Sequence, residues 1–80
     1  MENKMKAIIW SKENCSFCVQ AKNLLNMKGI EFEERKLGEG YTREQLLEAV
    51  PGASTIPQIF IDGEYVGGFK ELKEKFLKVA

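Results

Sequence analysis

The chain of 80 residues contains no histidine and only two cysteines, Cys15 and Cys18. Without histidine, neither a Cys–His nor a Ser–His nucleophile pair can form. A closed zinc site takes about four ligands, usually cysteine and histidine, so two thiols from one chain do not complete one. A small secreted domain held by disulfides needs more bridges than a single pair gives. These absences leave the cysteine pair as the candidate chemical centre.

The sequence also lacks an excess of charge of either sign. Twelve basic residues balance twelve acidic ones, so the formal net charge at pH 7 is +0. Such a chain has no strong field to attract nucleic acid or an anionic membrane surface. No apolar run approaches the length of a membrane span, and the first residues do not follow the pattern of a signal peptide. We therefore expect a cytoplasmic protein that binds neither nucleic acid nor membrane. We also expect it to be a monomer.

Hydrophobic periodicity and turn signals divide the chain into strands and helices. Short apolar runs predict strands, and apolar residues at helical spacing predict helices. Gly29 is a stop signal for the first helix, and Thr42 with Gln45 forms a capping box at the start of the second. Asp62-Gly63 is a strong two-residue hairpin signal. The expected elements are a strand at 5–10, a helix at 16–28, a strand at 30–37, a helix at 43–50, strands at 58–61 and 65–66, and a helix from 69 onward.

This order, β-α-β-α-β-β-α, predicts an α/β fold in a single domain, residues 1–80. The first strand–helix–strand unit implies two parallel strands with a right-handed crossover, and the hairpin adds an antiparallel pair. The result is a four-stranded mixed sheet covered by three helices, the minimal thioredoxin-like fold. Trp10 is expected in its core. The two cysteines fall at the turn from the first strand into the first helix.

The spacing of Cys15 and Cys18 predicts thiol–disulfide exchange. The reactive species is the thiolate, and Cys15 lies where the first helical turn offers free N–H groups and the positive end of the helix dipole. Lys12 adds positive charge, so we expect a lowered pKa for Cys15. Cys18 lies one turn further along the same face, closer to the core, where a higher pKa is expected. Cys15 is therefore assigned as the nucleophile and Cys18 as the resolving thiol.

Two further segments are candidate substrate contacts. Pro57 precedes an apolar strand and cannot donate to the sheet, and prolines in such positions are often cis. If Ile56 presents its backbone beside Cys15, an extended peptide can pair with it, whereas the alternative is a simple proline at a strand start. Gly67-Gly68 before a helix lets backbone N–H groups approach an anion, and the alternative there is an ordinary turn and cap.

Three collinear stretches resemble the glutaredoxins and cover nearly the whole chain. They are Ser11-Lys12-x-x-Cys15-Ser16-Phe17-Cys18, Thr55-Ile56-Pro57-Gln58-Ile59-Phe60-Ile61-Asp62-Gly63, and Gly67-Gly68-Phe69. The resemblance implies a glutathione-dependent enzyme that reduces protein disulfides and protein–glutathione mixed disulfides. Its implied partners are glutathione and disulfide-containing or glutathionylated proteins. Glutathione is the reducing co-substrate, and no bound cofactor or metal is expected.

By position, the resemblance also implies the residues that bind glutathione. Lys12 would meet a carboxylate, Phe17 would replace a tyrosine beside the nucleophile, and Ile56 would pair with the cysteinyl part of the tripeptide. Arg43 or Gln45 would meet the glycyl carboxylate, by a weaker alignment. The implied glutathione contacts are Lys12, Phe17, Thr55, Ile56, Pro57, Gly68, Phe69, Lys70 and Glu71.

Departures from the family pattern keep two alternatives open. Ser16 stands where proline is common, and serine there occurs in members that hold a [2Fe–2S] cluster between two chains with glutathione as an extra ligand. Phe17 stands where tyrosine is commoner. Lys70 is a cation where an acid is often found, and Glu71 replaces aspartate. The Lys70 departure motivates the second alternative, a glutaredoxin-like protein reduced by a thioredoxin-type reductase.

Overall fold

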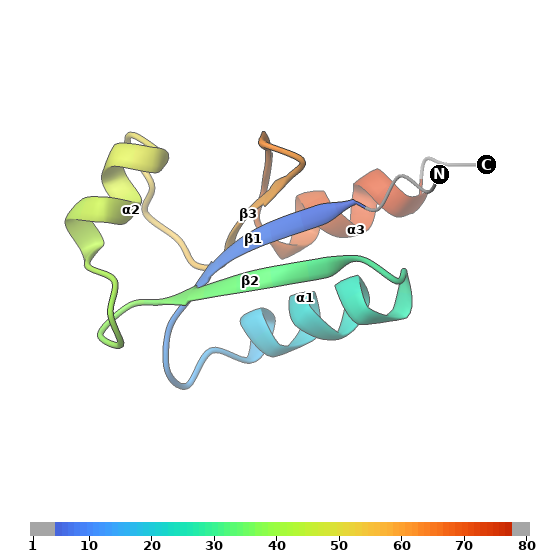
Figure 1. Ribbon diagram of the computed structural model, residues 1–80, viewed down its shortest axis with the longest axis horizontal. Helices are drawn as coiled ribbons and strands as arrows, with labels where there is room; N and C mark the ends of the chain where they lie inside the picture. Colours follow the sequence, from blue (N-terminus) through green and yellow to red (C-terminus); the bar gives the residue numbers. More distant parts are fainter. Residues whose placement is uncertain (1–4, 78–80) are drawn as a thin grey trace.

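The computed structural model describes residues 5–77, and the expected elements follow one another in the expected order (Figure 1). Each boundary given by the sequence differs from the observed one by at most one residue. This agreement arises because the signals are local: caps, turns and the period of apolar residues. The elements are β1 Lys6–Ser11, α1 Ser16–Met27, β2 Glu31–Lys36, α2 Arg43–Ala49, β3 Gln58–Ile61, β4 Glu64–Gly67 and α3 Phe69–Leu77.

The four strands form one mixed sheet in the order β2-β1-β3-β4, which confirms the predicted thioredoxin-like fold. β1 pairs parallel with β2 and antiparallel with β3, and β3 pairs antiparallel with β4. α1 and α3 lie side by side over one face of the sheet (Figure 1). α2 stands at the end of the sheet where β1 and β2 finish. The turn from β1 into α1 therefore lies at one edge of this layered structure.

The core lies between the sheet and the helices α1 and α3. Alternate residues of β1 and β3 face these helices, because successive side chains of a strand point to opposite faces. On α1, buried residues recur at helical spacing and meet them. The buried cluster consists of Ala7, Ile9, Ala21, Leu25, Ile30, Ile59, Ile61 and Leu72.

The other face of the sheet carries an aromatic and cationic cluster near α2. Trp10 is 2% exposed, as the sequence predicts for a core residue. The guanidinium carbon of Arg35 lies 5.3 Å from the centroid of the Trp10 ring and 5.5 Å from that of Tyr41. Arg35 also donates to Glu33 at 2.8 Å, and this contact holds the pKa of the Glu33 carboxyl below its usual value.

Two leucines whose spacing places them on apolar helix faces are exposed instead. Leu47 of α2 is 36% exposed and Leu77 at the end of α3 is 77% exposed. In α2 only Leu46 is buried, because this short helix stands at the end of the sheet and does not lie flat on it. The periodicity of a helix indicates which residues share a face, but the packing of the fold decides how much of that face is covered.

Candidate active site

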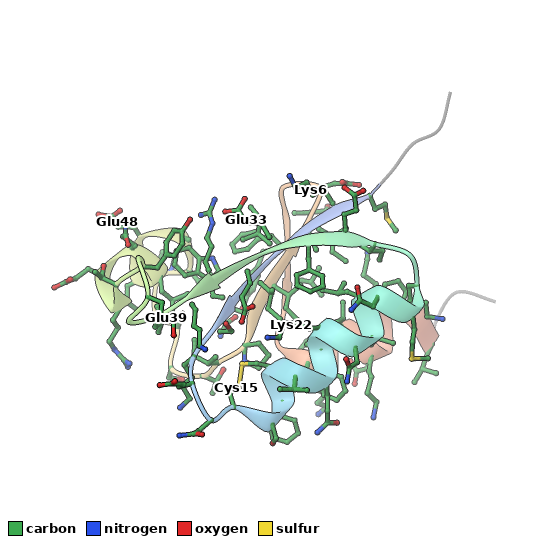
Figure 2. The ribbon with its side chains drawn as sticks, turned by 60° about the horizontal axis from the view of Figure 1, so that its bottom comes forward. Lys6, Cys15, Lys22, Glu33, Glu39 and Glu48 are labelled. Carbon is green, nitrogen blue, oxygen red and sulfur yellow. A yellow bond between two sulfur atoms is a disulfide. The ribbon has the colours of Figure 1, made fainter. Side chains whose placement is uncertain are left out.

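The cysteine pair lies at the start of α1, where the two sulfur atoms form a disulfide (Figure 2). Cys15 is the N-cap of α1, with φ −119° and ψ 100°. The N–H of Cys18 points at the Cys15 sulfur, 3.1 Å away. The first turn of the helix therefore directs one of its free N–H groups at the sulfur of Cys15, where an anion is stabilised once the disulfide is reduced.

The two cysteines differ in exposure. Cys18 is 2% exposed, whereas Cys15 is half-buried at the surface. This confirms the expectation that Cys18 lies closer to the core. The difference follows from the helix: Cys18, Ala21 and Leu25 form the buried stripe of α1, and Cys15 stands before the first turn. A substrate can therefore approach the sulfur of Cys15 more easily than that of Cys18.

The loop before β3 reaches the cysteine pair. The Ile56–Pro57 peptide bond is cis, and the Ile56 carbonyl oxygen lies 3.9 Å from the Cys15 sulfur. The expectation that the Ile56 backbone lies beside Cys15 is thus met. An extended substrate next to Cys15 has backbone groups within reach for pairing.

A buried set of side-chain hydrogen bonds around Gln58, called the brace below, holds this loop in place. The sequence did not reveal it. Gln58 is 4% exposed, and its Nε2 donates to the Thr55 carbonyl oxygen at 2.9 Å and to Thr55 Oγ1 at 3.1 Å. The hydroxyl of Tyr65 in β4 donates to Gln58 Oε1 at 2.5 Å. Every polar atom of the Gln58 amide is engaged, which is the usual condition for burying such a group. The brace fixes Thr55 to the strand beside the active site.

The junction of β4 and α3 is narrow at both of its glycines. Gly67 has φ +123°, and a Cβ there would lie 2.9 Å from Glu71 Cγ. A Cβ on Gly68 would lie 3.3 Å from the Pro57 carbonyl oxygen. The Gly68 N–H donates to Glu71 Oε1 at 2.9 Å, which caps the start of α3. The glycines thus let α3 begin directly against the cis-proline loop.

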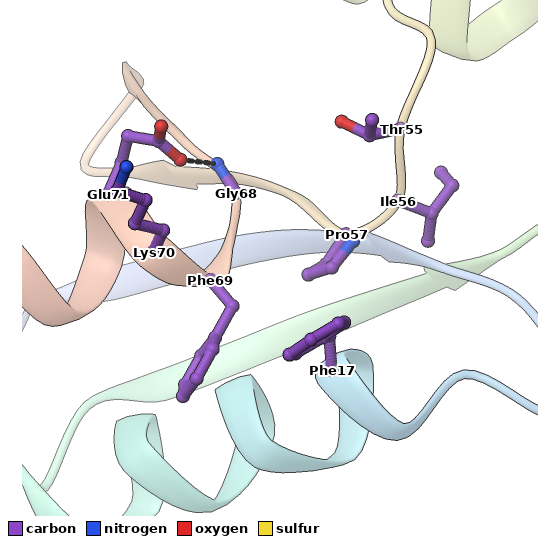
Figure 3. A pocket seen from close by; sticks show the side chains of 8 residues that line it. All are labelled: Phe17, Thr55, Ile56, Pro57, Gly68, Phe69, Lys70 and Glu71. Atoms are coloured by element: carbon purple, nitrogen blue, oxygen red, sulfur yellow. Dashed lines mark hydrogen bonds between the residues drawn. The ribbon is translucent and has the colours of Figure 1, made fainter.

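A pocket of about 230 Å³ opens between these elements (Figure 3). It contains every implied glutathione contact except Lys12. The rings of Phe17 and Phe69 stack at its side, with centroids 6.0 Å apart and planes 30° apart. Phe17 is 57% exposed, so its ring is open to a ligand. The residues that line the pocket are Phe17, Thr55, Ile56, Pro57, Gly68, Phe69, Lys70 and Glu71.

Lys12 lines a neighbouring hollow, together with Arg43, Thr55 and Ile56. Only one of the two residues of α2 that are candidates for a carboxylate contact lines this hollow. Arg43 lies in it, whereas Gln45 accepts from the Thr42 N–H at 2.8 Å as part of the capping box. Gln45 borders a different hollow beside Trp10. Arg43 is the residue of this pair that lies next to the predicted site.

Between residues 5 and 77, no three His, Cys, Asp or Glu side chains cluster in a way that could hold a metal ion. Over the same residues, no helix has both the length and the apolar character needed to cross a bilayer.

Comparison with known proteins agrees with this fold. The family model for glutaredoxin matches residues 7–66. Glutaredoxin 3 of Escherichia coli K12 is 42% identical over 65 residues, which cover 80% of this chain and 77% of that protein. Hybrid peroxiredoxin hyPrx5 of Haemophilus influenzae is 44% identical over 68 residues, covering 85% of this chain but only 28% of that longer protein.

Solved structures of glutaredoxins are also similar to this chain. Glutaredoxin 1 of Francisella tularensis, complexed with cacodylate, is 35% identical with a TM-score of 0.77, over 94% of this chain and 95% of that one. A buckwheat glutaredoxin–glutathione complex is 27% identical with a TM-score of 0.77, over 89% and 67% of the two chains. Fold and cysteine pair define a thiol–disulfide oxidoreductase with the thioredoxin-like fold. Within that class, the chain belongs to the glutaredoxin family.

Proposed function

We propose that the protein uses glutathione to reduce protein disulfides and protein–glutathione mixed disulfides, with Cys15 as nucleophile and Cys18 as resolving thiol. The observation that carries this proposal is the pocket of Figure 3, which lies beside the cysteine pair and gathers the implied glutathione contacts. The related buckwheat protein has been solved in complex with glutathione. We further propose that the enzyme acts as a monomer in the cytoplasm, where glutathione keeps thiols reduced.

The proposed reaction begins with the thiolate of Cys15. It attacks one sulfur of the substrate disulfide, an S–S bond to Cys15 forms, and the other substrate sulfur leaves as a thiolate. With a glutathionylated protein, Cys15 takes up the glutathione sulfur, and a second glutathione thiolate then releases oxidised glutathione. With a protein disulfide, the Cys18 thiolate attacks Cys15, which forms the observed disulfide and frees the reduced protein.

The proposed pose of glutathione follows the positions that the resemblance to the glutaredoxins implies. The cysteinyl part would pair with the backbone of Ile56, which lies beside the Cys15 sulfur. Lys12 and Arg43 would receive the glycyl carboxylate in the hollow next to Ile56. The γ-glutamyl end would lie over the stacked rings of Phe17 and Phe69, toward the start of α3.

The division of roles is tested by replacing each cysteine separately. We expect Cys15→Ser to abolish turnover of both substrate classes, because no thiolate remains to attack. We expect Cys18→Ser to keep turnover of glutathione mixed disulfides and to lose turnover of protein disulfides, since only the second reaction needs a resolving thiol. Steady-state assays with both substrates measure this. Normal mixed-disulfide activity in Cys15→Ser would mean that the roles are assigned wrongly.

The identity of the reductant is tested by comparing glutathione with a thioredoxin-type reductase as the electron source. Lys70 and Glu71 line the same pocket, so the cation stands beside the single carboxylate there, which already caps α3 through Gly68. This arrangement motivates the alternative in which a reductase replaces glutathione. We expect turnover with glutathione to exceed turnover with the reductase system. The reverse order would replace glutathione in this proposal and leave the oxidoreductase class intact.

A further inference from the structure

A hollow distinct from the pocket of Figure 3 also borders the cysteine pair. Both cysteines line it, together with Lys22 of α1 and Glu34 of β2. None of these four residues lines the pocket of Figure 3. The proposed reaction uses the two sulfur atoms but gives no role to the ionised side chains beside them.

These side chains belong to a chain of contacts that joins three elements. Lys22 Nζ lies 2.9 Å from Glu34 Oε2. The hydroxyl of Ser11, at the end of β1, donates to the same oxygen at 2.6 Å, and Ser11 is 0% exposed. The hydrogen bond from Ser11 and the contact with Lys22 hold the pKa of Glu34 below its usual value, so Glu34 is ionised at neutral pH. The carboxylate therefore keeps the Lys22 ammonium at the hollow.

The helix places Lys22 beside Cys18. Lys22 follows Cys18 by four residues on α1, and residues so spaced lie one above the other on the same face. Side chains of a helix lean toward its N-terminus, so the Lys22 stem points back over the turn that holds Cys18. Figure 2 shows Lys22 on the side of α1 that carries Cys15, and all three residues border one hollow.

Cys18 needs such a cation more than Cys15 does. It is 2% exposed, and burial disfavours the charged form of a thiol. Its own N–H points at the Cys15 sulfur, so this N–H stabilises charge on Cys15 and not on Cys18. A positive side chain held nearby would stabilise a thiolate at Cys18.

We propose that Lys22, held in place by Glu34 and Ser11, is a positioning residue that stabilises the Cys18 thiolate in the resolving step. In that step the Cys18 proton passes to water, and the thiolate attacks the Cys15 sulfur of the mixed disulfide. The Cys15–Cys18 bond forms, the bond from Cys15 to the target sulfur breaks, and the target leaves as a thiolate with the electron pair. This inference rests on the proposed role of Cys18.

Three other charged side chains line the same hollow: Lys12, Glu13 and Lys36. Lys12 and Glu13 precede Cys15 in the turn, so they lie nearer the nucleophile along the chain than the resolving thiol. Lys36 lies 3.5 Å from Glu39, which draws its ammonium toward the loop after β2. Lys22 is the cation of this group that shares a helix face with Cys18.

The first test measures the pKa of Cys18 alone, in the Cys15→Ser background, from the ultraviolet absorbance of the thiolate. We expect Lys22→Gln to raise this pKa by about half a unit to one unit, as the loss of a nearby charge requires. We expect Glu34→Gln to lower it, because a negative charge disappears while the amide still accepts from Ser11. Lys22→Arg keeps the charge and should restore the pKa. If both glutamine variants shift the pKa in the same direction, or neither shifts it, the proposal is wrong.

The second test separates the resolving step from the first attack. We expect Lys22→Gln to slow the reduction of protein disulfides about threefold more than that of glutathione mixed disulfides, because only the former uses the Cys18 thiolate. Lys75→Gln, which removes the same charge from an exposed position on α3, is the matched control and should change neither rate. An equal loss in both assays would overturn the proposal. Retained protein-disulfide turnover in Cys18→Ser would instead contradict the role of Cys18, while the pKa comparison would still test the electrostatic contact.

Discussion

At the scale of single residues, Glu34 links the chemistry of the site to the pH dependence of stability. Its Oε2 accepts from Ser11 and lies in an ion pair with Lys22, and these contacts hold its pKa below 4.5. A lowered carboxyl pKa means that the folded state favours the ionised form, so the stabilisation is complete above about pH 4.5 and disappears as the pH falls through the lowered pKa.

We therefore expect wild type to be more stable than Glu34→Gln by about 1 kcal/mol at pH 7, a value kept small because both partners are partly exposed to solvent. The difference should shrink as the pH falls through the lowered pKa of Glu34 and the carboxyl takes up a proton. Urea unfolding at pH 7 and at a series of acidic pH values measures it. Glu48→Gln, at an exposed position on α2, should show no such pH-dependent difference. A difference that stayed constant across this pH series would rule out the ionised form as its source.

Residues near one another in the sequence were easier to assign than residues brought together by the fold. Cys15 and Cys18 were found because their spacing and the helix start lie within one short segment. Gln58 was not found as a brace, because its partner Tyr65 meets it only through the pairing of β3 with β4. Glu34 was missed for the same reason: Ser11 lies 23 residues away in the sequence and donates to it only across two paired strands.

At the scale of elements, the short helix α2 depends on its own cap. It buries only Leu46 and stands at the end of the sheet, so tertiary packing contributes little to it. The Thr42 hydroxyl accepts from the Gln45 N–H at 3.2 Å, and Gln45 Oε1 accepts from the Thr42 N–H at 2.8 Å. This reciprocal pair satisfies two N–H groups that a helix start leaves free.

We expect Thr42→Ala to destabilise α2 by about 1 kcal/mol, the usual effect of removing an N-cap hydroxyl. Because α2 packs weakly, the loss should appear first as faster amide hydrogen exchange within α2, with little change in β1 or α1. Thr42→Ser keeps the hydroxyl and is the matched control. Uniformly faster exchange across the protein would show instead that α2 unfolds only together with the rest.

The elements themselves were predictable because each carries its own signal. Gly29 ends α1 with φ +71°, and the Ile30 N–H bonds the Leu25 carbonyl at 2.9 Å, as a helix stop at a glycine requires. Asp62 and Gly63 have φ of 52° and 82°, the left-handed pair that a tight hairpin needs. The exposure of Leu47 was not predictable, since no local signal tells where α2 stands relative to the sheet.

At the scale of the whole molecule, α1 serves two purposes at once. Its buried stripe begins at Cys18 and continues through Ala21 and Leu25 into the core. Phe17 of the pocket in Figure 3 and Cys18 and Lys22 of the hollow beside it therefore belong to a helix whose other residues hold the protein together. Cys18, the proposed resolving thiol, stands at the end of this hydrophobic stripe and is shielded from solvent by the same packing that stabilises the fold.

This arrangement makes the stability of the protein sensitive to the middle of α1. Leu25 is fully buried, and Leu25→Ala should leave a cavity and lower the free energy of unfolding by about 3 kcal/mol. The total free energy of unfolding of a chain of this length is roughly 4–12 kcal/mol. The Leu25→Ala variant should therefore unfold at a much lower urea concentration than wild type. Met27→Ala, on the same helix but 78% exposed, should change stability by less than about 0.5 kcal/mol. Because Leu25 lies about two turns from Cys18, activity per folded molecule in the absence of urea should stay near that of wild type. A loss of activity without a loss of stability would mean that the core beneath α1 also sets the position of the cysteine pair.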